Sequence, residues 1–410
     1  MTLHVGIEKA RVYPCSLTLS MSDLCAARGH DPADIRDVMM IDERSVNPPF
    51  EDPVTMAVNA ARPMLTDEDR RAIDLLIVAS ESGVDQEKPM STWVQRYLDL
   101  GPWTRNFEVK HACYGGTAGL VMAASHLASP FARPGAKALV ITTDQSRMHL
   151  GKPYEFVMGA GATALLVSRE PRLFELEPGS SGVFTHEVSD LTRPTSRVET
   201  GNSETSLLSY IDALDNAYRA YLESAGGGVG YDHFKKNVYH APFGGMTLRA
   251  TRAALRVLGD CTKERARAAW EEKTRASLAY VRRMGGTYSS STFIGLLSLV
   301  DHSPDLSAGD RIGMFSYGSG SCAEMYSGLL GAEFRSASAD AGVKSLLDRR
   351  RRLTVAEYEA IEQERTANVD AGEYEASLDV CDGLYDRAYA GRGLLVFKGI
   401  HDHYRKYGWS

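Results

Sequence analysis

Short runs of consecutive apolar residues recur along the chain, and Val, Ile and Leu dominate them. A run of roughly four to eight apolar residues between polar or small ones is typical of a strand that is buried on both faces. We therefore predict strands at residues 74–80, 138–144, 162–168, 311–318 and 393–400.

Longer stretches between these runs repeat their apolar residues with the period of a helix. Helices are predicted at residues 92–100, 118–127, 207–222 and 247–258. Because strands and helices alternate, the pattern predicts an α/β fold with largely buried sheets.

Two parts of the chain share one layout. In each, a turn of small residues runs into an apolar helix, as HACYGGTAG from His111 and as GGTYSSS from Gly285. Each helix is followed by a strand and a glycine-rich turn, and Gly, Ser, Pro and Thr are dense between residues 178 and 202. The sequence therefore predicts an internal duplication, with one half at residues 1–177 and the other at residues 178–410.

Composition narrows the class of protein. The chain has 410 residues and a net charge of −7, so no overall positive charge predicts a nucleic-acid partner. The six cysteines form no C-x-x-C pair, which predicts neither a disulfide framework nor a zinc site. No apolar run approaches the ~18 residues that span a bilayer, and the first residues lack the layout of a signal peptide. We therefore expect a cytoplasmic protein without a membrane partner.

Cys113 is a candidate nucleophile. The stretch EVKHACYGGTAG places it between an apparent strand and an apolar helix, so it lies near a helix N-terminus, where the helix dipole favours an anionic sulfur. The two glycines that follow would let another molecule approach the backbone. The alternative interpretation is a buried structural cysteine.

Glu81 and His240 are candidate partners of this cysteine. Glu81 follows a predicted strand, and the C-terminal ends of strands are where open α/β sheets place ligands. His240 lies in YHAPFGG, a loop with one proline and two glycines. The turn from Ser316 to Gly320 could supply backbone N–H donors for an oxyanion. Alternatively, Glu81 is a solvated charge, His240 is structural, and SYGSG is only a tight turn.

Together these motifs resemble the 3-hydroxy-3-methylglutaryl (HMG) synthase family. The similar stretches are EDPVTMAVNAA, SESGVDQEKPMSTWV, HACYGGTAGL, SLLSYIDALDNAY, YHAPFGGM, TYSSS, FSYGSG and the terminal YRKYGWS, and they follow the family's order along essentially the whole chain. DQEKP and HAPFGGM look more like the subgroup that installs β-methyl branches in polyketide synthase pathways than like the mevalonate-pathway enzyme. The resemblance implies a duplicated thiolase-like fold with αβαβα layers, and a homodimer.

The resemblance also implies residue roles. Cys113 would carry the acyl group, Glu81 would be the general acid/base, and His240 would orient the acceptor. Further residues would bind substrate or form the oxyanion hole: Ser319, Gly318, Tyr288 and Ser206. Chemistry supports Glu81, because an acetyl thioester that is not formed by decarboxylation must lose a methyl proton to a base. The implied cycle needs no metal or redox cofactor.

Two differences from the family's usual sequence affect the expected substrates. Gly286 stands where the family usually has an asparagine that helps to hold the acceptor, and Ser289, Ser290 or a water are candidates to replace it. HAPFGGMTL lacks the lysine with which CoA-using relatives bind phosphate. Substrates on the phosphopantetheine arm of acyl carrier proteins, as donor and acceptor, therefore fit better than CoA. The alternatives are an HMG-CoA synthase of primary metabolism and a non-catalytic homologue that binds acyl carriers.

A carrier protein is acidic and would need a basic docking surface. Arg249, Arg252 and Arg256 have the spacing of one helix face directly after the His240 loop. They are predicted either to dock the carrier or to form a solvated helix face. The basic run at residues 349–352 is predicted to be mostly solvated surface.

Overall fold

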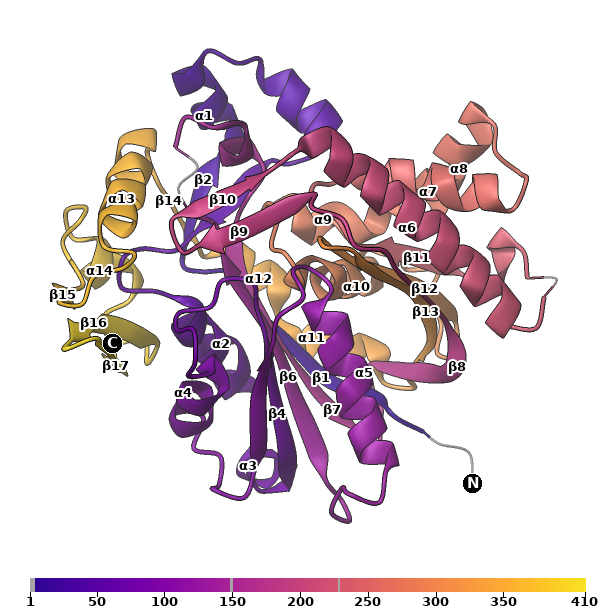
Figure 1. The fold of residues 1–410 in the computed structure, drawn as a ribbon, viewed down its shortest axis with the longest axis horizontal. Helices are drawn as coiled ribbons and strands as arrows, with labels where there is room; N and C mark the ends of the chain where they lie inside the picture. The colour runs from indigo at the N-terminus through magenta and orange to yellow at the C-terminus, as the bar shows by residue number, and fades with distance from the viewer. Residues whose placement is uncertain (1–3, 148–149, 228) are drawn as a thin grey trace.

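The computed structural model describes residues 4–147, 150–227 and 229–410. Its largest sheet contains β1 (Gly6–Tyr13), β4 (Ile73–Ala79), β5 (Arg105–Val109), β6 (Lys137–Gln145), β7 (Ala160–Ser168), β8 (Phe174–Thr185), β11 (Lys236–Tyr239), β12 (Arg311–Gly318) and β13 (Cys322–Leu330). In the described residues these strands form one nine-stranded sheet in the order β11-β12-β13-β8-β1-β7-β6-β4-β5 (Figure 1).

The pairing pattern occurs twice. β1 is antiparallel to β7, β7 is antiparallel to β6, and β6 is parallel to β4. In the same way, β8 is antiparallel to β13, β13 is antiparallel to β12, and β12 is parallel to β11. The two sets join where β1 pairs with β8. This repeated order confirms the predicted duplicated fold.

Helices cover the sheet in layers. α5 (Gly115–Ala128) and α10 (Ser290–His302) belong to one central apolar core, together with residues of β4, β6, β7 and β12. α2 (Pro53–Ala61) and α4 (Met90–Tyr97) pack on the first strand set, whereas α6 (Ser203–Ser224) and α7 (Met246–Val257) cover the second. Each strand set forms one β layer, with α5 and α10 between the two sets and the other helices outside them. The layers therefore alternate as αβαβα (Figure 1).

The remaining elements lie around this framework. The other α-helices are α1 (Met21–Arg28), α3 (Asp67–Ala72), α8 (Lys263–Lys273), α9 (Leu278–Val281), α11 (Phe334–Ala341), α12 (Val343–Asp348), α13 (Val355–Ala367) and α14 (Leu384–Ala388). Three small sheets are formed by β2 (Leu17–Ser20), β3 (Glu43–Val46) and β14 (Arg351–Arg352), by β9 (Leu191–Thr195) and β10 (Val198–Gly201), and by β15 (Tyr374–Glu375), β16 (Leu395–His401) and β17 (Tyr404–Trp409).

All five predicted strands and all four predicted helices are present, with ends shifted by a few residues. β8 is not among the predicted strands, because its middle residues, EPGSS, have the composition of a loop. β8 is nevertheless a strand because its backbone pairs with β13. The boundary predicted between residues 177 and 178 lies inside β8, and the division into halves at that point remains a prediction. In the part of the chain that the structure describes, no helix is long and apolar enough to cross a bilayer.

Candidate active site

The predicted site residues lie at the ends of strands and at the starts of the two central helices. Glu81 follows β4, and Cys113 lies two residues before α5. His240 follows β11, Tyr288 precedes α10, and Ser319 follows β12. The duplicated fold therefore brings segments from both sequence halves to one place.

Cys113 and Glu81 are in direct contact. The Cys113 thiol donates to Glu81 Oε2 at a sulfur–oxygen distance of 3.5 Å. Removal from solvent raises the pKa of the Glu81 carboxyl, and the nearby Asp144 carboxylate raises it further. Removal from solvent also raises the pKa of the Cys113 thiol, with the Glu81 charge acting in the same direction. This corrects the expectation of an anionic sulfur: desolvation and the facing carboxylates oppose the helix dipole, so the resting thiol is neutral.

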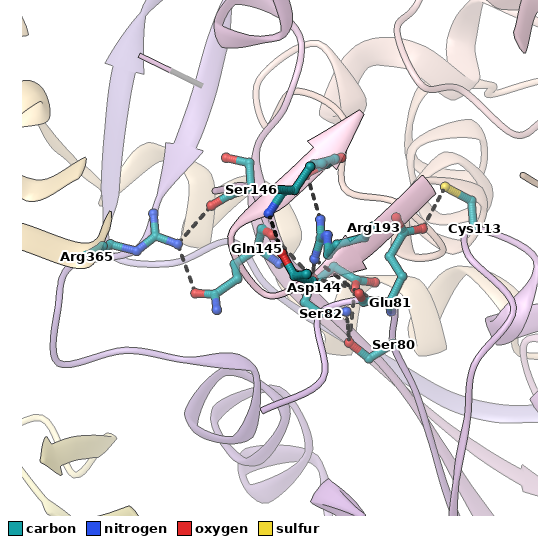
Figure 2. A network of polar contacts seen from close by, with 12 residues as sticks. Ser80, Glu81, Ser82, Cys113, Asp144, Gln145, Ser146, Arg193 and Arg365 are labelled. Atoms are coloured by element: carbon teal, nitrogen blue, oxygen red, sulfur yellow. Dashed lines mark hydrogen bonds and ion pairs between the residues drawn. The ribbon is translucent and has the colours of Figure 1, made fainter. Parts of the chain in front are cut away.

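Asp144, at the end of β6, fixes the segment that carries Glu81. Its Oδ1 atom accepts from the Ser80 hydroxyl at 3.0 Å, the Glu81 N–H at 2.9 Å and the Ser82 hydroxyl at 2.9 Å. Figure 2 shows these contacts, with Arg193 on one side and Cys113 on the other. Backbone and side-chain hydrogen bonds therefore hold the candidate base in one orientation.

The TYSSS turn connects Cys113 with His240. The Ser289 hydroxyl donates to the Cys113 carbonyl at 2.8 Å and accepts from the Gly116 N–H at 3.1 Å. The Ser291 hydroxyl lies 2.9 Å from His240 Nδ1. One short segment at the start of α10 thus positions both the candidate nucleophile and the candidate acceptor-binding imidazole.

His240 is buried and rigidly held. Its backbone N–H donates to the Phe315 carbonyl at 2.8 Å, and its backbone carbonyl accepts from the Tyr210 hydroxyl at 2.8 Å. Its side chain is excluded from water, which lowers the pKa of His240 to about 3. The imidazole is therefore neutral at neutral pH, and it acts as a hydrogen-bonding group and not as a stored positive charge.

The predicted oxyanion turn packs against the cysteine segment. A Cβ atom on Gly318 would lie 2.6 Å from the Tyr114 backbone nitrogen, so only glycine permits this close approach. Among the described residues, the backbone N–H groups of Cys113 and Ser319 have no hydrogen-bond acceptor. Both donors are therefore available to a substrate oxygen.

Tyr288 and Ser206 differ in their placement. Tyr288 is buried, adopts a positive φ of 52°, and its hydroxyl has no partner among the described residues. Its phenol is close enough to Glu81 for the two charges to interact. Ser206 lies in the first turn of α6, where its backbone N–H donates to the Asn202 carbonyl. These contacts group Tyr288 with the site, whereas the role of Ser206 remains a prediction.

Gly286 has no room for a side chain. A Cβ atom there would lie 2.7 Å from the Pro242 carbonyl oxygen, on the loop that carries His240. The candidates to replace the missing asparagine are also engaged, since Ser289 bonds to Cys113 and the Ser290 hydroxyl lies 2.6 Å from that of Thr142. Neither serine hydroxyl is free to hold an acceptor.

The two basic stretches differ in exposure and in ion pairing. Arg249, Arg252 and Arg256 are exposed along α7; Arg256 pairs with Asp215 at 2.5 Å, whereas the other two have no ion pair among the described residues. In the run at residues 349–352, Arg350 is buried and paired with Glu43 at 2.6 Å. Arg351 and Arg352 also form ion pairs. Arg349 and Arg352 are exposed, as expected of solvated surface, whereas Arg350 is buried and Arg351 is half-buried, so the expectation holds for only part of the run.

Two residues of the cluster were missed by the sequence analysis. Asp144 is a charged residue that ends an otherwise apolar strand, ALVITTD, and this contrast could have identified it. Arg193 lies far from the other motifs in sequence, in β9, and no local pattern distinguishes it. Within the described ranges, no group of three or more His, Cys, Asp or Glu residues could hold a metal ion.

Comparison with known proteins identifies the family. Residues 254–407 match the model described as hydroxymethylglutaryl-coenzyme A synthase C terminal. Relatives that match nearly the whole chain extend this similarity, and the chain belongs to the hydroxymethylglutaryl synthase family. Members of this family are condensing, acyl-transferring enzymes with a thiolase-like fold, and this chain is such an enzyme.

Three relatives are particularly similar. The polyketide biosynthesis 3-hydroxy-3-methylglutaryl-ACP synthase PksG of Bacillus subtilis (strain 168) is 35% identical over 422 residues, covering 99% of both chains. The hydroxymethylglutaryl-CoA synthase of Enterococcus faecalis is 35% identical over 360 residues, covering 88% of this chain and 91% of that one. The curacin biosynthetic pathway HMG synthase, solved in complex with acetyl donor-ACP, is 39% identical with a TM-score of 0.93, covering 99% of this chain and all of the other.

Proposed function

We propose that this enzyme carries out an HMG synthase condensation on carrier-bound substrates during polyketide β-branching. The contact between the Cys113 sulfur and Glu81 Oε2 at 3.5 Å is the observation that carries the proposal. A thiol and a carboxyl that has a raised pKa, side by side and half-buried, suit an acyl carrier and a base for a weakly acidic methyl group.

The first step loads the enzyme. The Cys113 sulfur attacks the acetyl thioester of a donor carrier protein, and the carrier thiol leaves with a proton. Glu81 then removes a proton from the Cys113-bound methyl group. The resulting enolate oxygen is stabilised by the free backbone N–H groups of Cys113 and Ser319.

The second step forms the carbon–carbon bond. The enolate carbon attacks the β-ketone of an acceptor thioester, whose oxygen accepts a hydrogen bond from neutral His240. A Ser291 hydroxyl that donates to Nδ1 leaves the proton on Nε2, where it can meet this oxygen. Glu81 returns the methyl proton to the new alkoxide, and water cleaves the product from Cys113. No metal or redox group is required by these steps.

Carrier proteins are proposed as partners for two reasons. Arg249 and Arg252 are exposed cations without an internal ion pair on a helix that follows the His240 loop. Two of the relatives described above are named for, or solved with, an acyl carrier protein. These arginines would attract an acidic carrier and bring its phosphopantetheine arm to the site.

We also propose a homodimer in the cytoplasm. In the described residues β5 pairs only with β4, so its second edge is open. Trp103 and Phe131, which flank β5 and α5, are 85% and 75% exposed, and Val121 and Met122 are exposed on α5. An open strand edge beside large exposed apolar side chains is typical of a surface that a second copy covers. The six free cysteines fit a reducing compartment.

Acetyl transfer tests the proposal. Intact-protein mass spectrometry should show faster acetylation of Cys113 by an acetyl-loaded carrier protein than by acetyl-CoA at equal concentration. Faster transfer from acetyl-CoA would favour an HMG-CoA synthase such as the Enterococcus faecalis relative. No transfer from either donor would indicate a non-catalytic homologue.

A further inference from the structure

The β9–β10 hairpin reaches the site without belonging to the large sheet. Its strands pair with each other, with Gly201 opposite Leu191 and Val198 opposite Thr195. In Figure 1 it crosses in front of the sheet, above β4 and β6. We call residues 191–201 the clamp hairpin. Its base, middle and tip each bind a different part of the protein.

The middle of the clamp hairpin contacts the Glu81 segment through Arg193. Arg193 Nη1 donates to the Glu81 carbonyl at 3.1 Å and to the Ser82 hydroxyl at 3.3 Å. Its Nη2 donates to Glu199 Oε2 at 2.8 Å, from the other strand of the hairpin. The side chains of Arg193 and Glu199 are 15% and 19% exposed. A forked guanidinium therefore joins the hairpin to the residues that flank the candidate base (Figure 2).

Asp190, directly before the clamp hairpin, connects the base of the hairpin to the turn that carries Ser319. Buried Asp190 accepts from the Gly320 N–H at 3.0 Å and from the Tyr317 hydroxyl at 2.8 Å. At the tip, Arg197 pairs with Asp370 at 2.6 Å. The clamp hairpin thus spans the turn that carries Ser319, the segment that carries Glu81, and the C-terminal region.

Arg193 also changes the charge balance around Glu81. The titratable groups that face Glu81 are Cys113 before α5, Asp144 on β6, Arg193 and Glu199 on the hairpin, and Tyr288 before α10. Asp144 and Glu199 disfavour the ionised form of Glu81, whereas the Arg193 cation favours it. The reaction needs that ionised form, because only a carboxylate can remove the methyl proton.

We propose that Arg193 is a positioning residue, which holds the Glu81 segment against Cys113 and favours the ionised form of the base beside two further carboxyl groups. The proposal rests on the function proposed above. Arg193 acts through Glu81 and does not touch the reacting atoms. Two properties of its guanidinium are needed, the positive charge and the fork, which bonds Glu81 and Ser82 through Nη1 and Glu199 through Nη2.

Three variants separate these properties. Arg193→Gln removes charge and fork, Arg193→Lys keeps the charge without the fork, and Arg197→Gln removes the same charge from the same hairpin four residues away. Arg197 is a matched control because it pairs with Asp370 at the surface and not with the Glu81 segment. Two readouts are measured against pH: deuterium exchange into the acetyl methyl group on Cys113, and alkylation of unacylated Cys113 by iodoacetamide.

In Arg193→Gln both pH curves should move to higher pH, because loss of this cation raises the pKa of Glu81 and disfavours any further negative charge in the cluster that Cys113 shares. Exchange at neutral pH should fall about 10- to 100-fold. Arg193→Lys should keep the wild-type midpoint with a lower maximal rate, and Arg197→Gln should match wild type. Unshifted curves in Arg193→Gln, or an equal shift in Arg197→Gln, would overturn the proposal. Alkylation needs no acyl substrate, so it decides the role of Arg193 separately from the proposed function.

Discussion

At the scale of single residues, the chemistry depends on carefully placed neutral groups. Cys113 and Glu81 are half-buried and His240 is buried, and desolvation raises the pKa of the first two and lowers that of the third. A neutral thiol, a carboxyl that ionises late and a neutral imidazole avoid an uncompensated charge in the empty site.

Two of the three serines of the TYSSS turn, Ser289 and Ser291, should separate the two halves of the reaction. Ser291→Ala removes the hydroxyl on His240 Nδ1, so we expect condensation to fall by about 10-fold while acetylation of Cys113 is retained. Ser289→Ala removes the bond to the Cys113 carbonyl and should slow acetylation itself. Single-turnover measurements of both steps test this contrast, and equal effects of the two variants on both steps would contradict it.

At the scale of elements, the sequence predicted what local patterns encode. An apolar run predicted the strand that Glu81 follows, and the small-residue turn predicted the start of α5. The pattern could not predict β8, whose backbone pairs with β13 despite a loop-like composition. Nor could it predict Arg193, because its place beside Glu81 depends on how the clamp hairpin folds back across the chain. The resemblance predicted that Glu81 and Cys113 act together, but only the folded structure gives the distance between them.

The loop after β11 should not accept the asparagine that the family usually has at position 286. In Gly286→Asn the new Cβ atom would displace the Pro242 carbonyl, which lies two residues after His240. We expect acetylation to remain and condensation to fall. Gly101→Ala is the control, because no atom lies within 4 Å of a Cβ at that glycine. Faster condensation by Gly286→Asn would show that the loop does accommodate an acceptor-binding side chain.

Helix α7 should affect carrier-bound substrates only. Reversing the charge of Arg249, Arg252 and Arg256 should slow acetylation by an acyl carrier protein, and more so at low salt, because exposed charges are screened beyond ~10 Å at 0.1 M salt. Small pantetheine thioesters should react at nearly the wild-type rate. Equal loss with both kinds of donor would mean that α7 is structural, and no loss would place the docking surface elsewhere.

At the scale of the whole molecule, the open edge of β5 should be covered by a second copy. Replacing Trp103 and Phe131 together by glutamate should convert a dimer into a monomer, since buried charge in an apolar interface is costly. Light scattering after gel filtration measures the mass of each species. Leu208→Glu is the control, because Leu208 is 62% exposed on α6, away from β5. A monomeric wild type, or a dimer that survives the double substitution, would contradict this surface.

The central claim is that the molecule divides one reaction between Cys113, which carries the acetyl group, and Glu81, which removes its methyl proton. The most direct measurement is peptide-level mass spectrometry of wild type, Cys113→Ser and Glu81→Gln. Each protein is mixed first with an acetyl-loaded carrier protein and then with a β-ketoacyl carrier. We expect acetyl on Cys113 in wild type and in Glu81→Gln, none in Cys113→Ser, and condensed product from wild type alone. Acetyl on another cysteine, or product from Glu81→Gln at the wild-type rate, would contradict the account.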